Sequence, residues 1–202
     1  MEYQNKYNLP PELVTLVDRE LESGEHVEWA AQPIPGRLAR SAIPTVLFGI
    51  PWTAFAIFWT AMAAAGLWRK KSEGEFGWFR LFPLWGVPFI LIGFGMLSSP
   101  FWARRQAKRT AYVLTDRRAI IISVGWRSKV SLRSFDPPAL MDLRRTERAD
   151  GSGDLVFTSD QHTGNRGRDY STAVGFTAIK DVKEVEERVR RLVRQSRDAQ
   201  AS

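Results

Sequence analysis

The chain lacks cysteine altogether and has two histidines among its 202 residues. The absence of cysteine excludes disulfide bonds, zinc–thiolate sites and cysteine nucleophiles. Charge is also missing locally, because residues 41–68 and 81–103 contain no Asp, Glu, Lys or Arg. These runs are 28 and 23 residues long. As helices they would reach about 42 Å and 35 Å, which exceeds the roughly 30 Å hydrocarbon core of a bilayer.

The two uncharged runs predict a transmembrane hairpin over residues 41–103, with spans at about 43–68 and 81–103. An even number of crossings leaves both termini on one side of the membrane. Six basic residues lie before the first span or after the second one: Arg37, Arg40, Arg104, Arg105, Lys108 and Arg109. Four lie between the spans: Arg69, Lys70, Lys71 and Arg80. The positive-inside rule therefore favours a multi-pass protein of the cell membrane with both termini in the cytoplasm.

Small residues predict close packing of the two spans. Gly86 and Gly93 are seven residues apart and share a face of the second span, and Ala54, Ala61 and Ala65 nearly share one in the first. Two prolines at the start of the first span leave its beginning open: the helix begins either near residue 43 or only after Pro51.

The remaining composition is strongly basic, with a net charge of +7 and a pI near 10. On a membrane protein the simplest partner of such a charge is anionic lipid. Arg104, Arg105, Lys108 and Arg109 directly follow the second span, so they are the candidate lipid-headgroup site. The alternative is that these four residues only determine topology. No nucleic-acid partner is expected, since no recognised module or interleaved aromatic pattern accompanies the charge.

The polar flanks predict two further parts. Residues 1–40 are expected to form a cytoplasmic segment with a loose start, a short helix after Pro10 and a short strand over residues 26–29. Residues 104–197 are expected to form one domain, in which the hydrophobic period changes to two after Arg109. This period predicts six antiparallel strands, with a polar loop over residues 160–169, and residues 110–197 are expected to fold without the spans. An amphipathic helix closes this part through Val182, Val185, Val189 and Leu192, and residues 198–202 are expected to be a disordered tail.

The second of these parts resembles the bacterial pleckstrin-homology-like domains of small membrane proteins. The resemblance rests on Tyr112–Ile121 (YVLTDRRAII), Asp150–Phe157, Gly175–Ile179 and the upstream Gly24–Trp29 with Pro33. It covers about residues 20–195 and implies a seven-stranded barrel capped by a helix. The predicted fold class is thus an α+β membrane protein, in which a transmembrane hairpin precedes a small antiparallel β-barrel. The family implies no single activity, because that fold hosts lipid, peptide and protein binding.

No residue constellation indicates a reaction. Ser159, Asp160 and His162 are close in sequence, but no strand-to-helix nucleophile elbow surrounds the serine. The Asp150–Asp154 segment lacks the bidentate glutamate of a calcium loop and predicts a turn. We therefore expect no enzymatic activity, metal, cofactor or small-molecule substrate. The expected function is binding of a protein or a lipid headgroup at the cytoplasmic membrane face, with a protein partner or a homo-oligomer. The alternative is an accessory subunit of a membrane transporter or envelope enzyme complex.

The topology is open to a direct test. Reporter fusions at Gly74 and at Ser202 should report opposite sides of the membrane, with Ser202 in the cytoplasm, because six basic residues flank the hairpin and four lie within it. Paired alkaline phosphatase and fluorescent-protein fusions measure this. A periplasmic Ser202 would overturn the orientation, whereas two fusions on the same side would overturn the hairpin.

Overall fold

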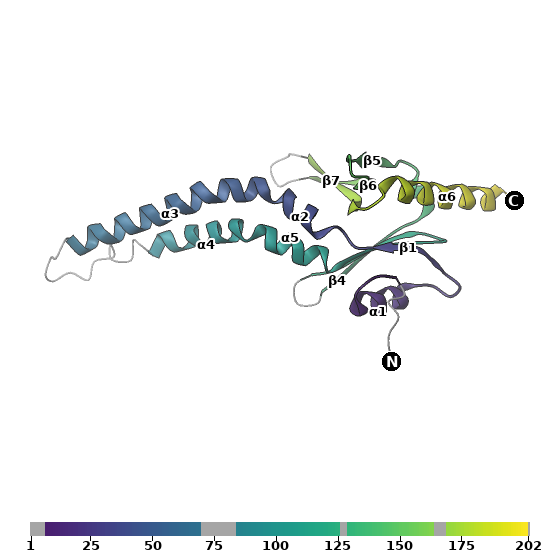
Figure 1. The fold of residues 1–202 in the computed structure, drawn as a ribbon, viewed down its shortest axis with the longest axis horizontal. Helices are drawn as coiled ribbons and strands as arrows, with labels where there is room; N and C mark the ends of the chain where they lie inside the picture. The colour runs from purple at the N-terminus through teal and green to yellow at the C-terminus, as the bar shows by residue number, and fades with distance from the viewer. Residues whose placement is uncertain (1–6, 70–83, 126–128, 164–168, 202) are drawn as a thin grey trace. The chain divides into compact units, whose positions relative to one another are not determined.

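The computed structural model describes residues 7–69, 84–125, 129–163 and 169–201 (Figure 1). The elements are α1 (Pro11–Glu20), β1 (Val27–Ala31), α2 (Pro35–Ser41), α3 (Ile43–Arg69), α4 (Gly86–Leu97), α5 (Ser99–Ala107), β2 (Thr110–Thr115), β3 (Ala119–Val124), β4 (Val130–Phe135), the 3₁₀ helix η3 (Pro137–Leu140), β5 (Arg144–Glu147), β6 (Gly153–Thr163), β7 (Asp169–Ile179) and α6 (Val182–Ala201). This order confirms the α+β class.

The chain divides into two compact units, and one of them is discontinuous in sequence. The helical unit comprises residues 38–104, and the sheet unit comprises residues 1–37 and 105–202. The sequence-based division treated residues 1–40 and 104–197 as separate parts, whereas the structure places them in one unit. The reason is β1, which precedes the helical unit along the chain but pairs antiparallel with β2, from Val27 opposite Thr115 to Ala31 opposite Tyr112.

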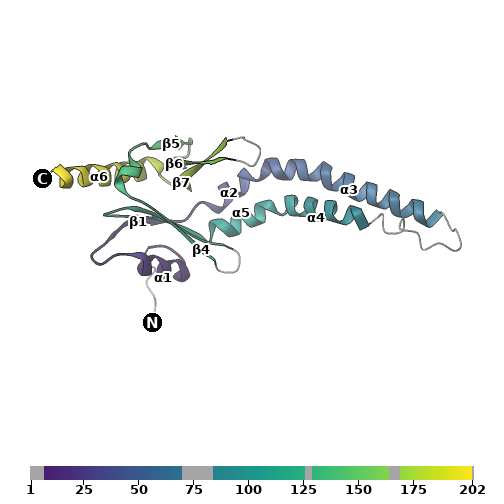
Figure 2. The ribbon, with the colours of Figure 1, turned by 180° about the vertical axis from the view of Figure 1, so that it is seen from behind.

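The sheet unit contains two antiparallel sheets and two hydrophobic clusters. One sheet has the order β1-β2-β3-β4, and the other has the order β5-β6-β7. The larger cluster joins both sheets to α6 and includes Phe157, Phe176 and Val189, and the smaller joins α1 to β2 and β3. Figure 2 shows α1 near the four-stranded sheet and α6 with the three-stranded one. Every residue of β2 is buried because apolar side chains cover both of its faces.

The strand pairings in the described residues form two sheets, and they do not close into the barrel that the resemblance implies. A backbone hydrogen bond joins the segment after β1 to the end of β7, from the Ile34 amide to the Ala178 carbonyl oxygen at 2.8 Å. The flanking residues Pro33 and Pro35 carry no N–H group. A continuous ladder between these two segments therefore lacks the donors it would need.

Several boundaries differ from the expected ones. Residues 160–163 continue β6 and Asp169 begins β7, so the polar loop predicted over residues 160–169 is wrong at both ends; residues 164–168 lie outside the described residues. The pairing of these two segments explains the difference, because the ladder from Ser159 opposite Ala173 to Thr163 opposite Asp169 satisfies their backbone groups. Helix α6 continues to Ala201 into the predicted tail, which contains helix-favouring residues and neither Pro nor Gly. Leu9 is buried in the smaller cluster, which corrects the loose start at that residue.

The helical unit is built on close contact between α3 and α4. Gly86 packs against the Thr60 side chain and Gly93 against Thr53, so that an added Cβ at either glycine would collide with the threonine. Gly49 on α3 faces Met96 in the same way. The glycine face of the second helix is thus confirmed. Ala54 and Ala61 are exposed, so the alanine face is wrong, because Gly49, Thr53 and Thr60 form the contact instead.

Among the described residues, one helix is long and apolar enough to cross a membrane, or two if a bent pair counts as one span, by length and composition. Residues Ile43–Ala65 of α3 form the first, with a mean hydropathy of 1.6. The helix begins at Ile43 and runs through Pro51, so the later start is wrong. Helices α4 and α5 meet at a 46° bend. The 12 residues of α4 reach about 18 Å, too short to cross alone.

The discontinuity of the sheet unit leads to a prediction. Residues 105–202 alone should not fold stably, because β2 would lose its β1 neighbour and the apolar face under α1 would be exposed to water. Joining residues 1–37 to 105–202 through a flexible linker of about ten residues should restore a cooperative thermal transition, measured by circular dichroism.

A matched control uses the same fusion with Val17→Asp, which places a charge in the smaller cluster. A fragment of residues 105–202 that melts at the same temperature as the fusion would contradict this prediction and support the independent folding that the sequence favours.

Candidate functional site

The predicted headgroup residues lie at the end of α5 and in the turn that leads to β2. Arg104, Arg105 and Lys108 are exposed, and Arg109 is half-buried. The backbone of the turn is fixed: the Lys108 carbonyl accepts a hydrogen bond from Gln32 Nε2 at 2.8 Å, and the Arg109 carbonyl accepts one from the Val124 amide at 2.8 Å. The structure therefore holds the backbone of Lys108 and Arg109 in place while the cluster presents its charge to solvent.

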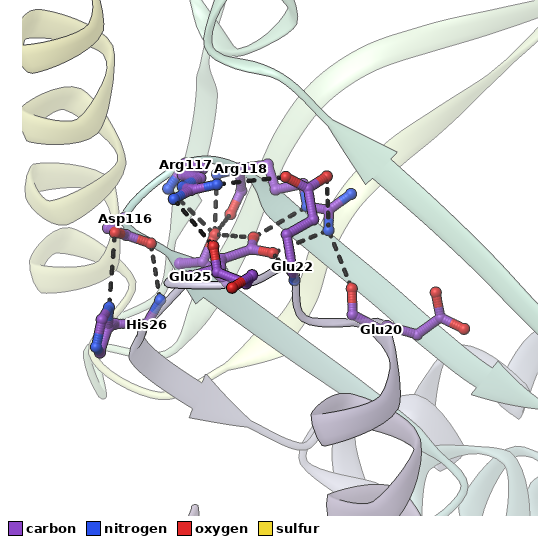
Figure 3. Close-up of polar contacts among 9 residues, drawn as sticks. Glu20, Glu22, Glu25, His26, Asp116, Arg117 and Arg118 are labelled. Atoms are coloured by element: carbon purple, nitrogen blue, oxygen red, sulfur yellow. Dashed lines mark hydrogen bonds and ion pairs between the residues drawn. The ribbon is translucent and has the colours of Figure 1, made fainter.

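A buried ion pair forms a second polar cluster, which the sequence analysis did not find (Figure 3). The side chain of Glu25 is fully buried, between the end of α1 and the β2–β3 turn. Arg118 donates to both of its oxygens, from Nε to Oε1 at 3.0 Å and from Nη2 to Oε2 at 2.9 Å. The Thr115 hydroxyl donates to Oε1 at 2.7 Å and the Glu22 amide to Oε2 at 2.8 Å. Four donated hydrogen bonds thus satisfy the buried carboxylate.

The balance of these contacts sets the pKa of Glu25. Burial alone would raise this pKa, because it disfavours the charged carboxylate. The hydrogen bonds from Arg118, the Glu22 amide and Thr115 outweigh burial and lower the pKa of Glu25 from its ordinary value of 4.5 to about 2. Glu25 in turn raises the pKa of Arg118. The pair is therefore charged at neutral pH and is a structural element, with no lone pair directed to an external ligand in the described contacts.

The pair joins segments that are 93 residues apart in sequence. Both segments occur among the residues that carry the family resemblance, but nothing in the sequence indicates that they meet. A second contact supports the same junction, since the His26 amide donates to Asp116 Oδ1 at 2.9 Å and the Asp116 amide to the His26 carbonyl at 3.0 Å. The sequence signal that could have indicated this pair was a glutamate, Glu25, in the turn after a short helix, together with an arginine, Arg118, in a hairpin turn.

The structure also places the other residues that the sequence analysis considered for catalysis or metal binding. His162 lies in β6 opposite Tyr170, so it is in a strand and not in a loop; the side chains of Ser159, Asp160 and His162 lie outside the described residues. Asp150 is in the predicted turn, where Oδ1 accepts from the Ser152 hydroxyl at 2.9 Å and Oδ2 forms an ion pair with Arg37. Within the described residues, no group of three or more His, Asp or Glu side chains is placed to hold a metal ion.

The basic face of α6 contains an organised group of ion pairs. Glu186 is nearly buried and pairs with two arginines, Arg145 at 2.8 Å and Arg190 at 2.6 Å. Next to Arg190, a surface pocket of about 310 Å³ lies between α6 and the segment that follows η3. Its lining residues are Leu140, Met141, Asp142, Leu143, Arg190, Val193 and Arg194. The sequence analysis did not find this pocket, because its two walls are about 50 residues apart.

No protein-family model matches the chain, and neither a curated protein nor a solved structure matches it. The resemblance to pleckstrin-homology-like domains stays a prediction from the sequence.

The Glu25–Arg118 pair predicts a pH-dependent stability. Because the pKa of Glu25 is lowered by folding, the charged pair stabilises the sheet unit above about pH 4.5, and this contribution is lost as the pH falls toward about 2. Glu25→Gln should lower the free energy of unfolding by about 2 kcal/mol at pH 7 and by much less at pH 2. Denaturant unfolding in detergent, followed by near-ultraviolet circular dichroism, measures both values.

Glu22→Gln is the matched control, because Glu22 reaches the same arginine at 3.5 Å but its side chain is 60% exposed. We expect it to change stability by less than about 0.5 kcal/mol. Equal losses for the two variants, or a Glu25→Gln loss that is the same at both pH values, would contradict the assignment.

Proposed function

We propose that the chain is a non-enzymatic membrane-anchored binding protein. In this proposal the helical unit anchors the protein in the cell membrane, and the basic cluster Arg104, Arg105, Lys108 and Arg109 holds the sheet unit at the anionic headgroups of the cytoplasmic leaflet. The sheet unit, which resembles a pleckstrin-homology-like domain, is then available for a protein partner. The observation that carries the proposal is the exposed basic cluster at the end of α5 and in the turn after it, which begins where the uncharged run of residues 81–103 ends.

The surface of the helical unit supports a lipid environment. Large apolar side chains on α3 and α4 are exposed, among them Phe55 at 65% and Leu91 at 65%. A water-soluble unit of this size would bury such side chains, because exposed apolar patches are unfavourable in water. The polar groups on these helices are satisfied internally: Thr53 and Thr60 donate to the Gly49 and Ala56 carbonyls. Such internal hydrogen bonding is what a bilayer requires.

The pairing of β1 with β2 supports an even number of crossings. The chain leaves the sheet unit after Arg37 and returns to it at Arg105. Two strands of one sheet lie on the same side of any membrane. If α3 crosses the bilayer, the chain must therefore cross back before Arg105, and α4 with α5 is the described segment that is apolar enough to do so.

The cluster is placed to interact with headgroups electrostatically. Four basic residues immediately after a span gain about 1 kcal/mol each near an anionic leaflet. They fall within six residues of the end of the uncharged run at Ala103, which keeps them within about one Debye length of the surface, roughly 8 Å at physiological salt. We also propose that the protein has no enzymatic activity. This part of the proposal is supported by Glu25, Arg118 and Tyr112, whose pKa values are shifted, because their polar atoms are engaged in internal hydrogen bonds.

Charge removal tests the docking role. The chain has no cysteine, so Glu187→Cys on the exposed surface of α6 provides one labelling position. In nanodiscs that contain phosphatidylglycerol, replacing all four cluster residues with glutamine should reduce quenching of the label by a headgroup-attached quencher. High salt should reduce quenching of the unsubstituted protein in the same way, because surface attraction is screened whereas span insertion is not.

The matched control removes the same charge elsewhere, by replacing the exposed residues Lys180, Lys183, Arg191 and Arg197 with glutamine. We expect no loss of quenching. If correctly inserted cluster variant and unsubstituted protein show equal quenching at every salt concentration, the cluster only determines topology and the docking proposal fails.

A further inference from the structure

The pocket between η3 and α6 is lined by both apolar and charged residues. Of its apolar residues, Leu140 is buried, and Leu143 and Val193 are half-buried. Met141 is 57% exposed, which is unusual for an apolar side chain in the sheet unit. Arg190 and Arg194 contribute the rim from α6 and Asp142 contributes it from the opposite wall. The pocket is therefore lined by two guanidinium groups and one carboxylate together with apolar side chains.

The nearly buried carboxylate of Glu186 restrains one arginine of the rim, Arg190. Glu186 is nearly buried and accepts from Arg190 at 2.6 Å, while its other oxygen pairs with Arg145 at 2.8 Å. Because Arg145 also holds Glu186, the carboxylate is restrained from two sides and restrains Arg190 in turn. The bond to Glu186 uses one N–H group of a guanidinium that has five, so further donors remain at the rim.

The second arginine adds a further positive charge to the rim. Arg194 lies four residues after Arg190, and like charges at this spacing on a helix repel each other. In the described part of the chain, no carboxylate forms an ion pair with Arg194. An anion at the rim would accept from both guanidinium groups and relieve the repulsion. Planar guanidinium groups match carboxylates in a bidentate geometry.

We propose that this pocket binds a carboxylate attached to a short apolar group. The volume of about 310 Å³ lies at the lower end of small-molecule sites, which suits one apolar side chain next to the charge. The half-buried side chains of Leu143 and Val193 offer an apolar contact to this ligand, which a phosphate headgroup with polar neighbouring atoms would not use. Two sources carry the chemistry: a small apolar acid, or the C-terminal residue of a peptide. The site is independent of the basic cluster, so it stands or falls separately from lipid docking.

Methionine NMR on the full chain in detergent tests the proposal. The chain has four methionines, and of the described ones Met141 lies in the pocket while Met62 and Met96 lie on α3 and α4. Titration of ¹³C-methyl-labelled protein with N-acetyl-leucine should shift the Met141 methyl signal and leave the other two unchanged. For a ligand of this size we expect a Kd of about 1 mM. N-acetyl-leucinamide, which has the same apolar group without the charge, should not shift the signal.

Two variants give opposite expectations. Arg194→Gln should weaken binding about tenfold, since it removes a charge-assisted hydrogen bond. Asp142→Asn should tighten binding roughly threefold, since it removes the repelling carboxylate at the rim. The matched control is Arg197→Gln, which removes an exposed charge on the same helix outside the pocket and should leave the affinity unchanged.

The arms of the titration distinguish the source of the ligand. A tetrapeptide that ends in leucine with a free carboxylate should bind more tightly than N-acetyl-leucine if the natural ligand is a peptide terminus, and equally if it is a small acid. Either result supports the site. No Met141 shift with either probe, an equal shift with the amide, or an affinity that Arg194→Gln does not change would overturn it.

Discussion

The pairing of β1 with β2, locked by the buried Glu25–Arg118 ion pair, is the constraint on which the sheet unit depends. Without β1, the strand that is buried along its whole length would become a sheet edge. Closing a loop between these distant segments costs conformational entropy, which rises slowly with loop length. The helical unit lies within that loop and orders much of it, since α3 and α4 are packed together.

The two units are stabilised by different forces. The sheet unit buries aromatic and branched side chains between its sheets and α6; the ring centroids of Phe157 and Phe176, for example, lie 4.7 Å apart. The described residues of the helical unit form no such core, and its helices meet through glycine and threonine. Close backbone approach is the usual basis of helix association in lipid, where the hydrophobic effect does not drive helices together. The division of the chain thus follows the change of solvent that we propose.

Charge is distributed according to the same division. Within the sheet unit, acidic residues are engaged where burial would otherwise be costly: Glu25 and Glu186 each accept from arginine. The basic excess stays exposed at the end of α5 and along α6. We propose that the first of these surfaces meets an anionic membrane and that the second contains a pocket for a single anion. Arginine outnumbers lysine, 22 to 7, and its planar fork serves buried pairing and bidentate recognition better than a lysine amine.

Local patterns alone determined much of this protein. Uncharged runs indicated the apolar helices, alternation indicated β2, β3 and the start of β6, and the spacing from Val182 to Leu192 indicated the buried face of α6. Glycine spacing located one side of the α3–α4 contact, because close approach requires the absence of a side chain. The threonines opposite were not predictable, since a hydroxyl that bonds its own helix carries no local signal. Only the tertiary structure placed β1 in the sheet, matched Glu25 with Arg118 and brought η3 to α6. Each depends on residues far apart in sequence, whose contacts are selected by the whole core and not by the neighbours of either partner.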